Sequence, residues 1–516
     1  MRHPAPYTVA IPAPSEPATW DQLARTLSSL EAERDFPAEI LVVGDSAPPE
    51  AERHAPQVRF LQSASADPVS LRQAALAAAA ERWFAVLEPG TVLLPGALAL
   101  VAAGIRSHRD AAVVYTDEIA GDSDEPVLKP VWSPRLLLEG NYLGRLCLLR
   151  TDAARAAGGF VPDDVVTGGY DLLLRLVDRG AGVSHLPVIA VSTRESWPPT
   201  AGSEAAVAAA RCAGRSLVRR GVDGHVEPGA QWNRVRRSGP KPDVAVVIPT
   251  RDRVDLLRRC IGSVETNTSY PNVELVVVDN GSVERHSLDY LRALEHRVLP
   301  HPGPFNFSAI VNAAVAATTA PFVLLLNNDT EMENRDWLDV MVEEALDPSV
   351  GAVGCRLVGE DGHTQHEGIA LGLDGAPALN LDLGGYCNLD RAVRDVAAVT
   401  AACVLVPRSA FDAVGGFDPA LAVGYGDVDF CLRLREAGYR ILYTPHAVVR
   451  HLAQATRGKT PHPDDDDLFA ARWPLHRARE VDPFVNPRID GFAPLRLAAS
   501  GVAPATARHG RCHTDA

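Results

Sequence analysis

Residues 320–331 read APFVLLLNNDTE, and this stretch decides the fold. The run from 321 to 326 is almost wholly apolar and too short for a globular helix of ordinary length. It therefore predicts a strand buried on both faces of a mainly parallel sheet. The run ends on Asn327, Asn328 and Asp329. In open α/β sheets, ligands bind beyond the carboxyl ends of the strands, where a carboxylate can hold a divalent cation. A plain polar turn is the alternative interpretation.

The composition is that of an ordinary globular protein with an acidic balance. The chain has 516 residues, of which 46% are apolar, and a formal net charge of −15. This length predicts about two to four domains. The charge argues against a general nucleic-acid-binding protein and against a polybasic membrane anchor. The eight cysteines include no CxxC pair, which favours reduced thiols over disulfides or zinc sites. Neither a signal peptide nor a membrane-spanning helix is expected.

Segments typical of strands and helices alternate along the chain, as in α/β folds. The pattern restarts after the basic segment 234–242, RVRRSGPKP, which we interpret as a linker. We expect two tandem Rossmann-like domains with mainly parallel sheets, at 1–233 and 243–490. The residues from 491 to 516 carry weak order signals and are expected to form a flexible tail.

The restart is an internal repeat, which predicts two copies of one fold. Residues 170–180, YDLLLRLVDRG, match residues 428–438, VDFCLRLREAG, at an offset of 258. The strand expected at 83–87 matches the one at 322–326, at an offset of 239.

The two copies differ at the ends of these segments. Asp427 becomes Gly169, whereas Asp429 is kept as Asp171. The polar triplet after the opening strand becomes Glu-Pro-Gly at residues 88–90. We infer that the second copy is catalytic and that the first is structural or binds an acceptor.

Four motifs of the second copy occur together in a known family. They are VAVVIPTRDRVDLLRRCIGSV from residue 244, VELVVVDNGS from 273, LLLNNDTE from 324 and VGGFDPALAVGYGDVDFCLRLREAGY from 414. In this order and spacing they resemble a family 2 glycosyltransferase with the GT-A fold. The first copy is similar to the diverged, degenerate companion domain of two-module bacterial transferases. Those proteins are linked to O-antigen and other cell-surface polysaccharides and include rhamnosyltransferases.

The resemblance implies an inverting transfer of a sugar from a UDP-, dTDP- or GDP-sugar to an acceptor hydroxyl on a glycan or lipid-linked glycan. It also implies a divalent metal, Mg²⁺ or Mn²⁺, that offsets charge on the leaving diphosphate. We expect a cytoplasmic location, either at the inner face of the membrane or free of it, and no nucleic-acid partner.

The resemblance assigns the metal to the polar triplet, which matches the family's DXD motif. Asp329 becomes the metal ligand, and Asn327 and Asn328 touch the ribose or phosphate. The missing first aspartate lowers the negative charge of the site. His451 matches a further metal ligand of some GT-A enzymes, although a lone histidine can also be a surface or packing residue.

The donor residues also follow from the resemblance. Asp279, after the second strand, matches the position that binds the nucleobase, and Thr250 and Asp252 match contacts to the nucleoside. Asn306 matches a donor contact of relatives. A turn or helix-capping residue is the alternative interpretation of Asp279, and a capping role is equally open for Asp252.

The family's general base is the second residue of a Glu-Asp pair that opens a helix, and Asp427 matches it. Gly426 replaces the glutamate. Asp427 as a plain helix cap is the alternative. Because Asp429 persists in the copy without a base, we expect it to be structural and to bind the backbone or Arg433.

Two further features have open interpretations. His366, in QHEG, is a candidate acceptor contact. The acidic run at 462–467, HPDDDD, is either a solvated surface segment or a second metal site.

Two other function classes compete with a transferase. A catalytically inactive glycan-binding or scaffold protein would have no need for both Asp329 and Asp427. A nucleotide-sugar pyrophosphorylase would carry a glycine-rich basic signature after the first strand, and residues 248–252, IPTRD, contain no glycine.

Overall fold

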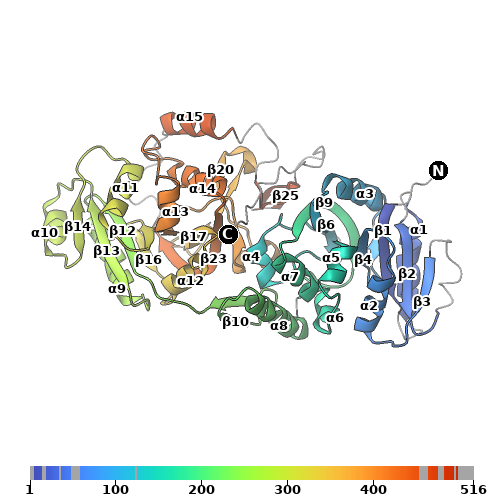
Figure 1. Ribbon diagram of the computed structural model, residues 1–516. Coiled ribbons are helices and arrows are strands. Elements are labelled where there is room, and N and C mark those ends of the chain that lie inside the picture. The colour runs from blue at the N-terminus through green and yellow to red at the C-terminus, as the bar shows by residue number, and fades with distance from the viewer. Residues whose placement is uncertain are drawn as a thin grey trace. The chain divides into compact units, whose positions relative to one another are not determined.

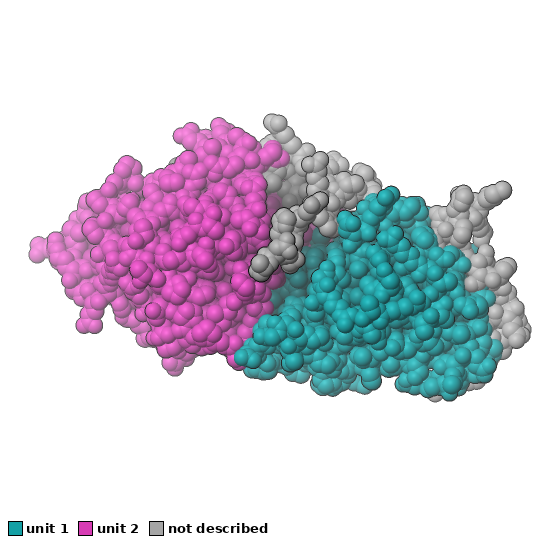
Figure 2. All heavy atoms as spheres, viewed as in Figure 1, with its two compact units in different colours: residues 1–235, 499–506 teal, residues 236–498, 507–516 magenta. Residues whose placement is uncertain are grey.

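The computed structural model (Figure 1) divides the chain into two compact units, coloured separately in Figure 2. The division falls between Val235 and Arg236, inside the segment interpreted as a linker. The structure describes residues 5–13, 19–33, 37–47, 58–122, 125–200, 202–452, 463–474, 482–492 and 495–497.

The second unit is built on one mixed sheet with the strand order β14-β13-β12-β15-β22-β17-β23-β16. The strands are β12 (Val244–Thr250), β13 (Val273–Asp279), β14 (Arg297–Pro300), β15 (Phe322–Leu326), β16 (Thr330–Met332), β17 (Val350–Val358), β22 (Cys403–Pro407) and β23 (Arg440–His451). Strands β12 to β15 run parallel to one another, and β22 pairs antiparallel with β15.

The apolar run of β15 is explained by burial on both faces of this sheet. All five of its residues are buried. Leu324 and Leu326 belong to one core cluster with residues of α9 (Val254–Thr266) and α12 (Trp337–Ala345). Val323 and Leu325 belong to the other cluster, with residues of α11 (Phe307–Ala317) and α14 (Gly426–Glu436). With both faces covered, no position of the strand is left for a polar side chain.

The first unit has a sheet of matching order, β3-β2-β1-β4-β8-β6-β9-β5. Its strands are β1 (Ala5–Pro12), β2 (Pro37–Gly44), β3 (Val58–Gln62), β4 (Trp83–Val86), β5 (Val92–Leu93), β6 (Ala111–Ala120), β8 (Cys147–Arg150) and β9 (Gly182–Thr193). Strand by strand, β4 takes the place of β15 and β9 that of β23. The prediction of two tandem α/β domains is therefore confirmed.

In the second unit, Asp429 joins two helices. Its Oδ2 accepts a hydrogen bond of 2.8 Å from Arg433 Nε, one turn along α14. Its Oδ1 accepts one of 2.7 Å from Arg472 Nη1, at the end of α15 (Pro463–Arg472). Asp429 is fully buried. The expected structural role and the expected contact with Arg433 both hold.

The first unit repeats this arrangement at Asp171. Its carboxylate accepts hydrogen bonds of 2.6 Å from Arg175 Nε, on α7 (Tyr170–Asp178), and of 2.9 Å from Arg215 Nε. Arg215 belongs to α8 (Ser203–Arg219). The repeat therefore extends to the helix after the last long strand, where the two sequences show no obvious match.

The end of the described chain forms a small hairpin. β24 (Ile489–Phe492) pairs with β25 (Leu495–Leu497), so the segment expected as a flexible tail begins within a strand. The rest of that segment, from 498, lies outside the described residues. Across the described ranges, no helix has both the length and the apolar character needed to cross a bilayer.

We expect Asp429→Asn and Asp171→Asn each to lower the free energy of unfolding of its own unit by about 1.5–3 kcal/mol, because each removes charge-assisted hydrogen bonds between a buried carboxylate and its arginine partners. Urea unfolding followed by hydrogen exchange assigns each loss to a unit. Unchanged stability in both variants would show that the repeated carboxylate does not hold the helices.

Candidate functional site

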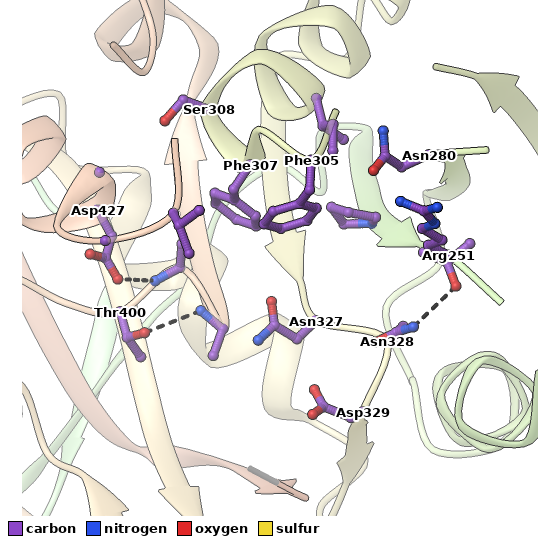
Figure 3. A pocket seen from close by; sticks show the side chains of 18 of the residues that line it. Arg251, Asn280, Phe305, Phe307, Ser308, Asn327, Asn328, Asp329, Thr400 and Asp427 are labelled. Atoms are coloured by element: carbon purple, nitrogen blue, oxygen red, sulfur yellow. Dashed lines mark hydrogen bonds between the residues drawn. The ribbon is translucent and has the colours of Figure 1, made fainter. Parts of the chain in front are cut away.

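A cavity of about 780 Å³ opens at the carboxyl ends of β12 and β15 (Figure 3). Apolar and polar side chains both line it, and the latter come from the loops that follow several strands. The sequence-predicted residues among them are Thr250, Asn327, Asn328, Asp329, Asp427 and His451.

The polar triplet links the ends of the two central strands. The backbone N–H of Asn327 donates to the carbonyl of Ala402 over 2.9 Å, which continues the pairing of β15 with its neighbour. Asn328 Nδ2 donates to Thr250 Oγ1 over 3.0 Å, and both residues are buried. Figure 3 shows this bond as a dashed line at the cavity wall. The triplet is therefore a fixed part of the site rather than a solvated turn.

Asp329 and His451 are brought together by strand register. Strand β16 pairs antiparallel with β23 so that Thr330 lies opposite His451. The Asp329 carbonyl accepts a hydrogen bond of 2.9 Å from the N–H of Leu452. As a result, Asp329 Oδ1 lies 3.3 Å from His451 Nε2. Asp329 is only 4% exposed.

This pair has part of the donor set that a hard divalent cation requires. Asp329 Oδ1 accepts no hydrogen bond of ordinary geometry from any described residue. Within the described ranges, no three acidic, histidine or cysteine side chains surround one metal position. A cation at the pair would therefore need further donors, such as the phosphate oxygens that Mg²⁺ commonly binds.

Asp427 lies in the first turn of α14 and lines the same cavity. Its Oδ1 accepts a hydrogen bond of 2.9 Å from the N–H of Val428, and its Oδ2 accepts one of 3.1 Å from the N–H of Ala401. The N-cap position belongs to Tyr425, whose side chain makes no capping bond. Asp427 thus contributes to the helix start, while its partly exposed carboxylate remains open to the cavity.

The glycine before Asp427 has a packing reason. A Cβ on Gly426 would lie 3.1 Å from Ser308 Oγ, on α11. The glutamate that the family pattern has at this position could enter only if Ser308 moved. The departure from the pattern therefore goes with close contact between α11 and α14.

In the acidic run at 462–467, Asp464, Asp466 and Asp467 are exposed, as the solvated-surface interpretation expects, and Asp465 departs from it. Within it, Asp465 is buried and accepts hydrogen bonds from the backbone N–H groups of Ala422, Val423 and Gly424, at 3.3, 2.8 and 2.6 Å. Val423 and Gly424 line the cavity. This acidic side chain therefore holds the cavity wall, and its neighbours form the first turn of α15.

Asp279 and Asp252 lie next to the cavity but do not line it. Asp279 Oδ1 accepts hydrogen bonds of 2.9 and 2.6 Å from the N–H and hydroxyl of Ser282. Asp252 Oδ1 accepts bonds of 2.8 Å from the N–H groups of Val283 and Glu284. Both carboxylates therefore hold the loop after β13.

Asn306 and His366 are likewise used by the fold. Asn306 caps α11 by accepting a bond of 2.9 Å from the N–H of Ala309, and its amide donates to the carbonyl of Pro419. His366 is 1% exposed, does not line the cavity, and its Nδ1 lies 2.7 Å from Asn380 Oδ1.

Sequence reasoning missed Asn280, which follows Asp279. Asn280 is 2% exposed and lines the cavity. Its Nδ2 donates to the carbonyl of His301 over 2.9 Å, whereas its Oδ1 is buried and accepts no hydrogen bond from any described residue. The DN pair was visible in the sequence. Which of two adjacent residues faces the cavity depends on the alternation of side chains along β13 and cannot be read from composition.

We expect the second unit to lose stability as the pH falls from about 6.5 to 4. Burial lowers the pKa of His366 to about 4. Because the unfolded chain binds this proton near pH 6.5, stability is complete above that pH and is lost through the interval, by up to about 3 kcal/mol. His366→Gln should flatten this slope in urea unfolding, and His363→Gln, at an exposed position, should not. Equal slopes in all three proteins would contradict the assignment.

Comparison with known proteins locates the family signal in the second unit. Residues 245–412 match the sequence model of the family described as Glycosyl transferase family 2. This range includes Thr250 and the polar triplet and ends before Asp427 and His451.

Several curated relatives align with the chain. The uncharacterized protein y4gI of Sinorhizobium fredii is 35% identical over 445 residues, which cover 79% of this chain and 48% of that protein. The O-antigen biosynthesis protein RfbC of Myxococcus xanthus is 32% identical over 423 residues, covering 77% of this chain and 33% of that protein. The chain thus spans about half or less of these relatives. The N-acetylglucosaminyl-diphospho-decaprenol L-rhamnosyltransferase of Mycobacterium tuberculosis is 25% identical. The aligned region covers 40% of this chain and 74% of that protein.

Among solved structures, GalNAc-T7 with UDP, GalNAc and Mn²⁺ aligns at 16% identity and a TM-score of 0.39, over 48% of this chain and 51% of that one. This likeness is too low for residue-by-residue comparison. The sequence match, the four ordered motifs and the strand order of the second unit agree in placing the likeness to glycosyltransferase family 2 in that unit.

Proposed function

We propose that the second unit transfers a sugar, with inversion, from a nucleoside diphosphate sugar to an acceptor hydroxyl. One observation carries the proposal: the Asp427 carboxylate and the Asp329–His451 pair line the same cavity. The first unit has Gly169 and Gly90 in the equivalent places. A binding or scaffold protein would have no use for this difference between the copies.

The cavity offers suitable partners for a nucleoside. Asn280 Oδ1, which accepts no hydrogen bond within the described part of the chain, can accept one from a ring N–H of a nucleobase. We propose this role for Asn280 rather than for Asp279, because the Asp279 carboxylate is already used by Ser282. Asn327 and Asn328 have amide groups for the ribose or phosphate.

The donor set also fits a divalent metal. Asp329 and His451 would hold the cation, and the absence of an ordinary hydrogen bond to Asp329 Oδ1 within the described residues agrees with a ligand role. When bound, the cation would offset the charge that develops on the leaving diphosphate.

Asp427 is proposed as the general base. The acceptor oxygen forms the new bond to the anomeric carbon, the bond to the diphosphate breaks, and the hydroxyl proton passes to the carboxylate. The backbone N–H groups of Ala401 and Val428 hold the carboxylate in one orientation throughout.

The names of the relatives support a role in cell-surface polysaccharide synthesis. RfbC is an O-antigen biosynthesis protein, and the mycobacterial relative transfers L-rhamnose to a diphospho-decaprenol-linked sugar. We therefore propose a glycan or lipid-linked glycan as the acceptor, used on the cytoplasmic face of a membrane.

Asp427→Asn should bind donor normally and turn it over more slowly by on the order of 10² to 10⁴, because an amide cannot accept the proton. Binding is measured by calorimetry with Mn²⁺ and a panel of UDP-, dTDP- and GDP-sugars. Turnover is measured as release of nucleoside diphosphate, with and without glycan acceptors. Glu88→Gln, in the first unit, is the matched control and should leave turnover unchanged.

Two outcomes would contradict the proposal. If Asp427→Asn retains normal turnover while Asp429→Asn is folded and inactive, the two aspartates have reversed roles. If the native chain binds donor and neither transfers nor hydrolyses it, the scaffold alternative is correct.

A further inference from the structure

The environment of His451 fixes which of its nitrogens carries the proton. Gln365 lies on β18 (Thr364–His366), which pairs with β17, and β17 pairs in turn with β23. Gln365 Nε2 lies 3.0 Å from the carbonyl oxygen of His451, and its Oε1 lies 3.1 Å from Nδ1 of the same residue. A carbonyl oxygen can only accept, so the amide NH₂ must face it.

The orientation of the Gln365 amide then determines the tautomer. With the NH₂ facing the backbone, Oε1 faces Nδ1, and an amide oxygen can only accept. Nδ1 must therefore be the protonated nitrogen of a neutral ring, which leaves a lone pair on Nε2. That lone pair faces Asp329 Oδ1 at 3.3 Å, and the side-chain amide of Asn327 lies 3.4 Å from the same nitrogen. In the neutral ring, two acceptors at this distance repel each other unless a cation lies between them, and in the doubly protonated ring the proton on Nε2 takes that place.

The first unit provides an internal comparison. Pairing of β7 (Pro126–Val127) with β6 sets Val127 opposite Glu118, as His366 is set opposite Leu357 in the second unit. In the second unit Val358 pairs with Thr364, so Gln365 bulges between two paired residues, whereas in the first unit Pro126 pairs directly with Ile119 and no residue takes the place of Gln365. The equivalents of Asp329 and His451 in that unit are Gly90 and Thr193. The copy that lacks both candidate ligands thus lacks the glutamine as well.

We propose that Gln365 is a positioning residue for metal binding: it holds the His451 ring with Nε2 toward Asp329. The inference rests on the proposed function, in that it assumes a cation at this pair. Residues that orient a metal-ligating histidine through its other nitrogen commonly contribute about 10- to 100-fold to metal affinity. Gln365 orients the His451 ring through one contact, to Nδ1. Its second contact, to the His451 carbonyl, fixes the orientation of the Gln365 amide.

The test is the Mn²⁺ affinity of the full chain, measured from the EPR signal of free Mn²⁺. UDP, dTDP or GDP is present in the measurement, whichever binds the native protein most tightly. Gln365→Leu removes the acceptor for Nδ1–H and should weaken Mn²⁺ binding by about 10- to 100-fold. Gln365→Glu keeps an acceptor oxygen and should stay near the native value. Both variants lose the bond to the His451 carbonyl, so a purely structural role would affect their melting temperatures alike.

Gln73→Leu is the matched control. In the first unit, Gln73 likewise donates to a backbone carbonyl, of Gly158, and accepts from a backbone N–H, of Phe160. It should change stability and leave Mn²⁺ affinity unchanged. Equal affinity in native protein, Gln365→Leu and Gln365→Glu would overturn the role of Gln365, as would an equal loss in both variants.

Asp329→Ala separates this inference from the proposed function. Loss of Mn²⁺ binding in Asp329→Ala together with full binding in Gln365→Leu would overturn only the positioning role. Unchanged binding in Asp329→Ala, or no Mn²⁺ binding by the native chain, would overturn the metal site itself and with it the role of Gln365.

Discussion

The antiparallel pairing of β16 with β23 is the constraint on which the site depends. It joins a segment just past the central strand to one more than a hundred positions later, and it sets Thr330 opposite His451. A shift of one residue would turn every side chain of β16 to the other face of the sheet. Asp329 would then leave His451 and turn away from the cavity. The chemistry of the site therefore depends on backbone hydrogen bonds, whose register cannot be read from the side chains in the sequence.

The two units separate what the fold requires from what the site requires. Both have the same strand order, both bury apolar residues on the two faces of the sheet, and both keep the carboxylate that joins two helices through arginines. The first unit shows that this framework folds without the polar cavity residues. The paired differences, second unit first, are Asp329 and Gly90, Asp427 and Gly169, and His451 and Thr193, and Gln365 has no counterpart in the first unit. They gather at one edge of the sheet, where substitutions do not disturb the core.

Much of the fold could be predicted from the sequence, because buried strands and repeated helices leave local patterns. The run at 321–326 and the match of Asp171 with Asp429 were sufficient to predict two α/β domains and a structural aspartate. The site was harder to predict. Asp279 and Asn280 are adjacent and both polar, and only the register of β13 decides which one faces the cavity. Asp465 lies in an acidic run that suggests a solvated surface, yet it binds three backbone N–H groups of the cavity wall. Contacts of this kind join segments far apart in the sequence, so they leave no periodic pattern from which they could be predicted.

The central claim is that one unit of the two binds donor. Hydrogen exchange of the full chain, with and without Mn²⁺ and the most tightly bound of UDP, dTDP and GDP, tests it most directly. We predict protection of the backbone around 249–251, 279–281 and 327–329, with no change at residues 88–90 of the first unit. Protection at residues 88–90, or at the same segments of both units, would contradict the account.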